Sequence, residues 1–124
     1  MATDIRIIHA HDFVMATHEG KLDFEKSKKA LIQIASAWSP LGGCEIILDT
    51  RKAHSKMSPT DLWYLAVELS NLRRAFSRRT AVLCPVERFD NAEFFALCAQ
   101  NRGLQLSTFT SFEDAIEWLT ADRA

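Results

Sequence analysis

The chain has 124 residues, of which 48% are hydrophobic and 25% are charged, and its formal net charge is −1. This length suits one domain with one good core, and the composition excludes an intrinsically disordered chain. The near-zero net charge excludes the broad basic field typical of nucleic-acid binding, and the apolar runs are too short to span a bilayer. The first residues lack the pattern of a signal peptide, so we expect a cytoplasmic protein.

Two strand-like segments, residues 5–9 and 13–18, open the chain, and Gly20 is expected to end the second. The short link between them allows only an antiparallel pair, which places the first strand at an edge of the sheet. Asp23 is then a good N-cap for a helix that runs to about Trp38, because apolar side chains recur after it at three- and four-residue steps.

The segment 46–51, Ile-Ile-Leu-Asp-Thr-Arg, is expected to form the central strand and its carboxyl end. A short apolar run that ends in polar residues predicts a strand buried on both faces, as in parallel sheets covered by helices. Residues 52–56 are polar and are expected to form a loop. Ser58 and Pro59 then suit the N-cap and first position of a helix that is expected to run to about Phe76.

The second half repeats the alternation of strands and helices. Residues 80–84 predict a strand, and Asp90 with Glu93 has the spacing of a capping box at the start of the next helix. Residues 104–109 predict the last strand and Ser111 caps the last helix. The order ββαβαβαβα predicts one α/β domain over residues 1–124, with four helices and a mainly parallel five-stranded sheet whose N-terminal edge strand is antiparallel.

This order of elements, the strand end at 46–51 and the closing segment 109–119 (FTSFEDAIEWL) resemble the STAS-like, or SpoIIAA-like, superfamily. These are small domains related to the anti-sigma-factor antagonists of bacteria. The resemblance implies a regulatory or ligand-binding module, not an enzyme. Its phosphorylatable members begin the helix after the central strand with a serine or threonine, which here matches Ser58 or Thr60. Partner-switching members have an Asp-Ser-Ser/Thr-Gly type of turn there, whereas this chain has Asp49-Thr50-Arg51 and a longer polar loop.

Ligands of parallel α/β sheets bind beyond the carboxyl ends of the strands. The ligand-binding residues expected there are Asp49, Arg51, His54, Ser58, Glu87 and Arg88. The cationic side chains and the free N–H groups at the start of a helix favour an anion. Two simpler interpretations remain open. Asp49 and Arg51 suit a structural ion pair that orders the following loop, and Ser58 suits a plain N-cap.

Other patterns are less specific. His9, His11 and His18 lack the spacing of a metal site, so we expect no metal and no cofactor. Three cysteines without C-x-x-C spacing are expected to be reduced and partly buried. Trp63 and Tyr64 lie beside the core stripe of their helix, which fits either a homodimer interface or a wide core stripe.

The function predicted from the sequence is a non-enzymatic regulatory or binding module for a protein partner or for a small anionic or apolar ligand. One alternative is a small hydrolase that uses Asp49 and His54 as acid–base groups. The other is a carrier of an apolar ligand, lined by Phe and Leu side chains of the second and third helices.

Overall fold

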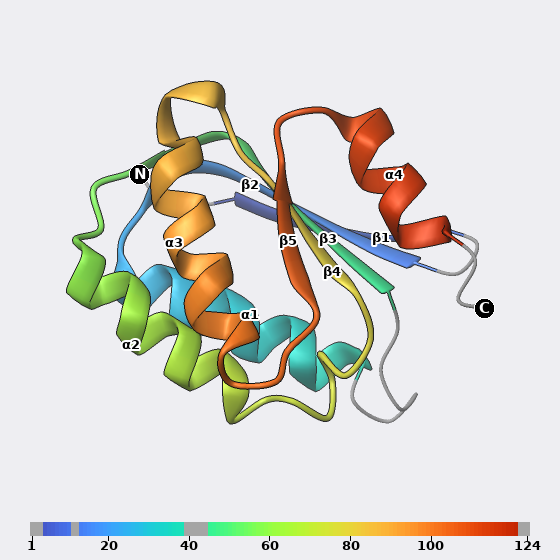
Figure 1. Cartoon of the computed structure of the whole chain (residues 1–124), viewed down its shortest axis with the longest axis horizontal. Coiled ribbons are helices and arrows are strands. Elements are labelled where there is room, and N and C mark those ends of the chain that lie inside the picture. Colours follow the sequence, from blue (N-terminus) through green and yellow to red (C-terminus); the bar gives the residue numbers. More distant parts are fainter. Residues whose placement is uncertain (1–3, 11–12, 39–44, 122–124) are drawn as a thin grey trace.

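The computed structural model describes residues 4–10, 13–38 and 45–121 (Figure 1). The strands are β1 (Asp4–Ala10), β2 (Phe13–Leu22), β3 (Glu45–Ser55), β4 (Thr80–Leu83) and β5 (Leu106–Phe109). The helices are α1 (Phe24–Trp38), α2 (Pro59–Ser70), α3 (Phe89–Gln100) and α4 (Phe112–Thr120), with a 3₁₀ turn at Val86–Arg88 before α3. The predicted α/β class, with four helices and a parallel sheet, is confirmed.

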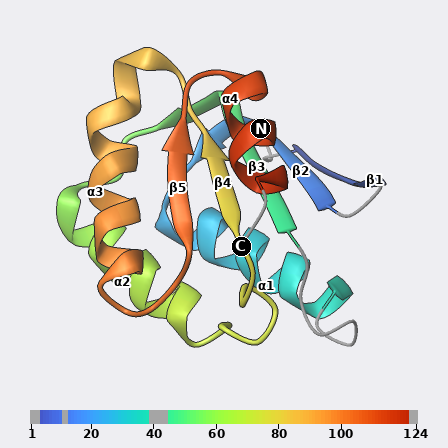
Figure 2. The same ribbon diagram turned by 45° about the vertical axis from the view of Figure 1, so that its right-hand side comes forward.

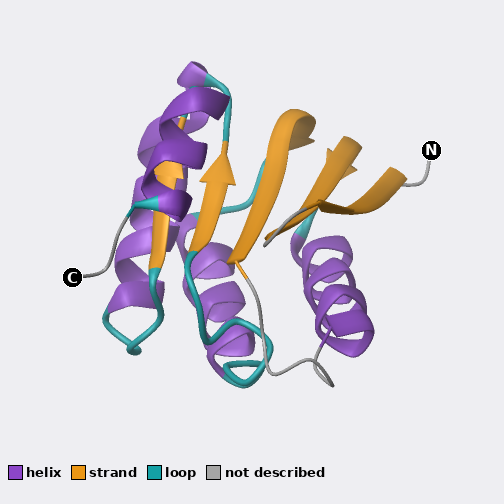
Figure 3. Ribbon diagram, turned by 90° about the vertical axis from the view of Figure 1, so that its right-hand side faces the viewer, coloured by secondary structure: helices purple, strands orange, loops and turns teal. Residues whose placement is uncertain are grey.

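The strands of the sheet follow one another in chain order, β1-β2-β3-β4-β5 (Figure 2). β1 pairs with β2 in the antiparallel sense, and the other three pairs are parallel. Each parallel crossover therefore steps to the next strand in the same direction. Crossovers of one hand that step in one direction put their helices on the same face of a sheet. This explains why α1, α2 and α3 cover one face while α4 alone lies on the other (Figure 3).

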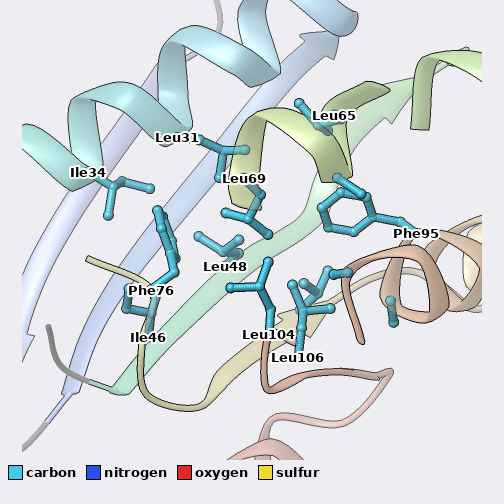
Figure 4. Close-up of a cluster of buried hydrophobic side chains, with 14 of the residues drawn as sticks. Leu31, Ile34, Ile46, Leu48, Leu65, Leu69, Phe76, Phe95, Leu104 and Leu106 are labelled. Atoms are coloured by element: carbon cyan, nitrogen blue, oxygen red, sulfur yellow. The ribbon is translucent and has the colours of Figure 1, made fainter. Parts of the chain in front are cut away.

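The two faces have separate cores because side chains alternate along each strand. On β3, Ile46 and Leu48 point into the larger core beneath α1, α2 and α3, where Leu69 and Phe76 pack against them (Figure 4). Ile47 points the other way, into a smaller core with β4 and α4.

Side-chain caps fix three helix starts as the sequence predicted. The Asp23 carboxylate accepts a hydrogen bond of 2.8 Å from the backbone N–H of Lys26, at the start of α1. Ser58 and Asp61 form a reciprocal capping box at the start of α2. The Ser111 hydroxyl accepts a hydrogen bond from the third residue of α4. Each cap satisfies a backbone donor that the helix itself leaves unpaired.

The loop predicted at residues 52–56 is wrong, because β3 continues to Ser55. β2 also continues beyond the predicted end at Gly20, and its residues up to Leu22 pair with β3 as far as Ser55. Gly20 lies inside β2 instead of ending it. Its φ is +88°, a value that glycine adopts without strain, so the strand can continue through it. Continued backbone pairing therefore outweighs the polar composition of this stretch.

Two helix boundaries also differ from the prediction. α2 ends at Ser70, and the chain continues in turns from residue 71 to residue 76, although Phe76 is still buried in the core. α3 begins at Phe89, directly after the 3₁₀ turn, and no side chain caps it. The predicted capping box at Asp90 is therefore wrong.

Candidate functional site

A cavity of about 100 Å³ lies between the sheet and the three helices of the larger core, and it is partly open to solvent. Its lining is mainly apolar and comes from β2, β3, β4, α1, α2, α3 and the 3₁₀ turn before α3. The largest apolar side chains of the lining are Leu22, Leu31, Leu48, Leu62, Leu65 and Phe95. Four of them, Leu31, Leu48, Leu65 and Phe95, are labelled in Figure 4. A concave, mostly apolar space with a few polar groups is the usual form of a small-molecule site.

The polar groups of the cavity follow from the register of the sheet. Ala16 on β2 lies opposite Leu48 on β3, which lies opposite Val82 on β4. Two residues further along these strands, on the same face, come His18, Thr50 and Cys84, and all three line the cavity. A polar row therefore borders an apolar row at the carboxyl ends of the strands. Ser27, Ser55, Arg88 and Asn91 complete the polar lining.

His18 is a buried polar side chain in this row, with only 5% of its surface exposed. Its Nδ1 atom has no hydrogen-bond partner among the described residues. Burial lowers the pKa of the His18 imidazole, and the nearby Asp49 carboxylate only partly offsets this effect. The ring is therefore neutral at pH 7. An unsatisfied buried polar atom costs about 1–3 kcal/mol, so this nitrogen is a natural contact for a bound molecule.

Arg88 brings a positive charge to the cavity. Its Nη2 atom donates hydrogen bonds of 2.7 Å to the carbonyl of Thr50 and 2.9 Å to the carbonyl of Ala53, and these bonds fix the side chain. Among the described residues, no carboxylate forms an ion pair with it. Burial lowers the pKa of the Arg88 guanidinium, although this group stays protonated in proteins.

Asp49 and Arg51 lie on the opposite face of the sheet, because they alternate with Leu48 and Thr50 along β3. The Arg51 guanidinium donates two hydrogen bonds, of 3.0 and 2.9 Å, to the two oxygens of the Asp49 carboxylate. Burial acts to raise the pKa of Asp49, but the hydrogen bonds and charge of Arg51 outweigh it and hold that pKa below its ordinary value. The expected ion pair is thus present, and it is separated from the cavity by the sheet.

Of the six predicted ligand-binding residues, the structure places Arg88 in the cavity lining and the other five outside it. His54 and Glu87 are exposed, and Ser58 is exposed at the start of α2, where its hydroxyl serves the capping box. Thr60 is exposed in the first turn of the same helix. The acid–base pair of the alternative hydrolase, Asp49 and His54, is likewise outside the cavity.

Sequence reasoning missed His18 and Thr50 as members of the site. The signal for His18 is the alternation along β2, which puts it on the same face as the buried residues Val14 and Ala16. Thr50 lies between two charged residues, Asp49 and Arg51, which are the more obvious candidates for a binding site. Its hydroxyl donates a hydrogen bond of 2.7 Å to the carbonyl of Leu83, so its side chain is held between β3 and β4.

The described part of the chain holds no group of three or more His, Cys, Asp or Glu side chains arranged to bind a metal ion. The side chains of His9 and His11 lie outside the described residues, as does Cys44. Cys84 is buried and Cys98 is half-buried, and both are free thiols. Burial raises the pKa of the Cys84 thiol, which keeps it uncharged at pH 7. No described helix is both long and apolar enough to cross a membrane.

Solved structures show what this architecture is similar to. An uncharacterised protein of the DUF3478 family with a SpoIIAA-like fold, from Shewanella loihica, matches with 17% sequence identity and a TM-score of 0.61, over 95% of this chain and 94% of that one. The anti-sigma factor antagonist SpoIIAA in its unphosphorylated form matches with 18% identity and a TM-score of 0.55, over 98% and 100% of the two chains.

An anti-sigma factor antagonist from Mycobacterium paratuberculosis matches with 13% identity and a TM-score of 0.61, over 95% of this chain and 94% of that one. No protein-family model and no curated protein matches the chain. The structural matches confirm the STAS-like, or SpoIIAA-like, fold that the sequence resemblance implied. At these identities the likeness establishes the fold alone.

The Asp49–Arg51 pair gives a prediction about stability and pH. Because the pKa of Asp49 is depressed in the folded state, the pair contributes stability above the ordinary aspartate pKa of about 4 and loses it as the pH falls through the lower folded value. Asp49→Asn should lower the free energy of unfolding by about 1 kcal/mol at pH 7, since Arg51 is partly exposed and solvent screens the pair. Urea unfolding at pH 7 and pH 3 measures this.

The difference between Asp49→Asn and the unmodified protein should shrink at pH 3, because below the ordinary aspartate pKa the unfolded chain binds a proton at Asp49 more readily than the folded protein does. Glu117→Gln, at an exposed position of α4, is the matched control and should change stability little at either pH. A loss that is equally large at both pH values would show that the ion pair is not its source.

Proposed function

We propose that this protein is a non-enzymatic binding module that takes a small, largely apolar molecule into the cavity between its sheet and α1, α2 and α3. The observation that carries the proposal is the cavity itself, with its apolar lining and its few convergent polar groups. An empty apolar space inside a core loses packing contacts, and a ligand that fills it restores them. Such a ligand would stabilise the folded state in proportion to its concentration and affinity.

The arrangement of acid–base groups argues against a hydrolase. Among the described residues, the cavity lining contains no carboxylate, and the Nδ1 atom of its neutral histidine has no hydrogen-bond partner to orient the ring as a base. Asp49 is bound by Arg51 on the other face of the sheet. General acid–base catalysis needs its groups within hydrogen-bond reach of one substrate, and these groups are not arranged that way.

A protein-interaction surface is the second candidate function. Trp63 and Tyr64 on α2 and Phe94 and Leu97 on α3 are exposed apolar side chains on two helices that pack together. Trp63 and Tyr64 meet edge to face with ring centroids 5.1 Å apart. Exposed apolar patches on small proteins often mark sites of association, and a second copy of the chain is the simplest partner.

Sedimentation equilibrium tests this second candidate. We expect a dimer, and Leu97→Glu should shift it to monomer because a charge would be buried at the interface. The control is Gln33→Glu, at an exposed position of α1. A monomeric wild-type protein at high concentration would contradict homodimerisation through this surface.

The cavity proposal is tested with benzene as an apolar probe, since dry apolar cavities of similar size bind it. Benzene should shift the amide NMR signals of residues around the cavity and raise the melting temperature. Ala92→Leu should abolish both effects, because Ala92 lines the cavity and the larger side chain would fill part of it. Gln33→Leu, which adds the same side chain on the exposed side of α1, should leave both effects unchanged.

Two outcomes would contradict the proposal. One is the absence of any benzene effect on the wild-type protein at saturation. The other is a set of signal shifts centred on the exposed side chains of α2 and α3 and unaffected by Ala92→Leu, since this would place the apolar site on the surface.

A further inference from the structure

The cavity has two chemically different ends, and the difference is built into the sheet. Its floor includes Leu48 and Val82, which lie opposite each other on two neighbouring strands. The next row on the same face contains His18 and Thr50, and the Arg88 side chain reaches this row from the 3₁₀ turn before α3. Any molecule that fills the cavity therefore meets hydrocarbon at one end and hydrogen-bonding groups at the other.

The polar end has a positive charge that forms no ion pair among the described residues, although the Glu87 carboxylate acts on it without such a contact. Only one nitrogen of the Arg88 guanidinium is used in the hydrogen bonds to the carbonyls of Thr50 and Ala53. Those bonds hold the group in place without supplying a negative charge. A half-buried cation that no carboxylate contacts gains from an anionic partner within hydrogen-bond distance, and the guanidinium matches the two oxygens of a carboxylate in particular.

The His18 imidazole supplies an independent indication of a ligand. This side chain is 5% exposed, lines the same cavity, and leaves its Nδ1 atom without a partner in the described part of the chain. A neutral imidazole carries one N–H donor and one acceptor nitrogen, so it can donate to an anionic oxygen. Buried polar groups are nearly always satisfied, which points to a partner other than the described residues, such as a bound molecule.

The volume of the cavity limits the size of the apolar part of the ligand. At about 100 Å³ it is smaller than the pockets of about 300–1,000 Å³ that hold drug-sized molecules. It is closer to an engineered cavity of about 150 Å³ in another protein that holds benzene. The apolar body of the ligand should therefore contain about six carbon atoms, as a short chain or a single ring. Long lipid chains exceed this space.

We propose that the cavity binds a small monocarboxylate, whose carboxylate accepts hydrogen bonds from Arg88 and His18 and whose short apolar body packs among Leu31, Leu62 and Phe95. This inference rests on the proposed function and names the class of its ligand. A phosphate group fits less well, because Arg88 is the only lysine or arginine among the described residues that line this cavity. A dianion there would keep an uncompensated charge.

The test compares hexanoate with 1-hexanol, which has the same chain length and no charge. Titration calorimetry should show that hexanoate binds about tenfold or more tightly than 1-hexanol, because charge-assisted hydrogen bonds are stronger than neutral ones. Arg88→Met should remove this preference while 1-hexanol still binds. Arg74→Met, at an exposed position beyond α2, is the matched control and should retain the preference.

The role of His18 is read from its ring nitrogens by NMR. Hexanoate should shift the ¹⁵N signals of the His18 ring and leave those of the exposed His54 ring unchanged. If Arg88→Met does not fold, Arg88→Lys keeps the charge and loses the forked geometry, and it should bind hexanoate more weakly than the wild type.

The outcomes of these experiments distinguish failure of the carboxylate inference from failure of the proposed function, which is the binding of a small apolar molecule in the cavity. Equal affinities of the wild-type protein for hexanoate and 1-hexanol would overturn the carboxylate inference and leave the apolar cavity intact. A preference for hexanoate that Arg74→Met reduces as much as Arg88→Met would also overturn it, since the charge would then act from the surface. Failure of hexanoate, 1-hexanol and benzene alike would overturn the proposed function as well.

Discussion

The shared direction of the three parallel crossovers determines on which face of the sheet the helices, the larger core and the cavity lie. Because β2, β3, β4 and β5 are neighbours in chain order, the helices between them all fall on one face of the sheet. That face therefore has three helices to pack, and the larger core forms there. Of the described helices, α4 lies on the other face, where it follows the last strand and covers β4 and its neighbours. A cavity with walls on several sides is found beneath the three helices, where α1, α2 and α3 meet the strand ends.

Because side chains alternate along each strand, the polar groups at the carboxyl ends of the strands lie on two opposite faces of the sheet. On β3, Thr50 faces the cavity, while Asp49 and Arg51 on either side of it face the other way. Asp49 and Arg51 form two hydrogen bonds of 3.0 and 2.9 Å with each other at the strand end. The cavity side keeps a buried imidazole and a fixed guanidinium without comparable partners. Asp49, Thr50 and Arg51 are neighbours in the sequence, but the sheet separates the side chain of Thr50 from those of the other two.

The order of the elements, the fold and three of the helix caps followed from the sequence, because hydrophobic periodicity and capping residues are local signals. Boundaries that depend on distant pairing did not follow. β3 extends through a polar stretch because β2 runs beside it, and nothing near Lys52 indicates that partner. The candidate site was predicted in part for the same reason. Arg88 was expected at the strand ends and lines the cavity, whereas His18 joins it only through the alternation of β2 and the pairing of β2 with β3. Neither strand order nor cavity shape is encoded in any single segment.

The central claim is that the cavity beneath α1, α2 and α3 is the ligand-binding site of this protein. A crystal structure of the protein grown with saturating hexanoate tests it most directly. The account predicts density for the acid inside the cavity, with its carboxylate within hydrogen-bond distance of Arg88 and His18 and its chain against Leu31 and Phe95. Density for hexanoate on the opposite face of the sheet, or a cavity that stays empty at saturation, would contradict the account.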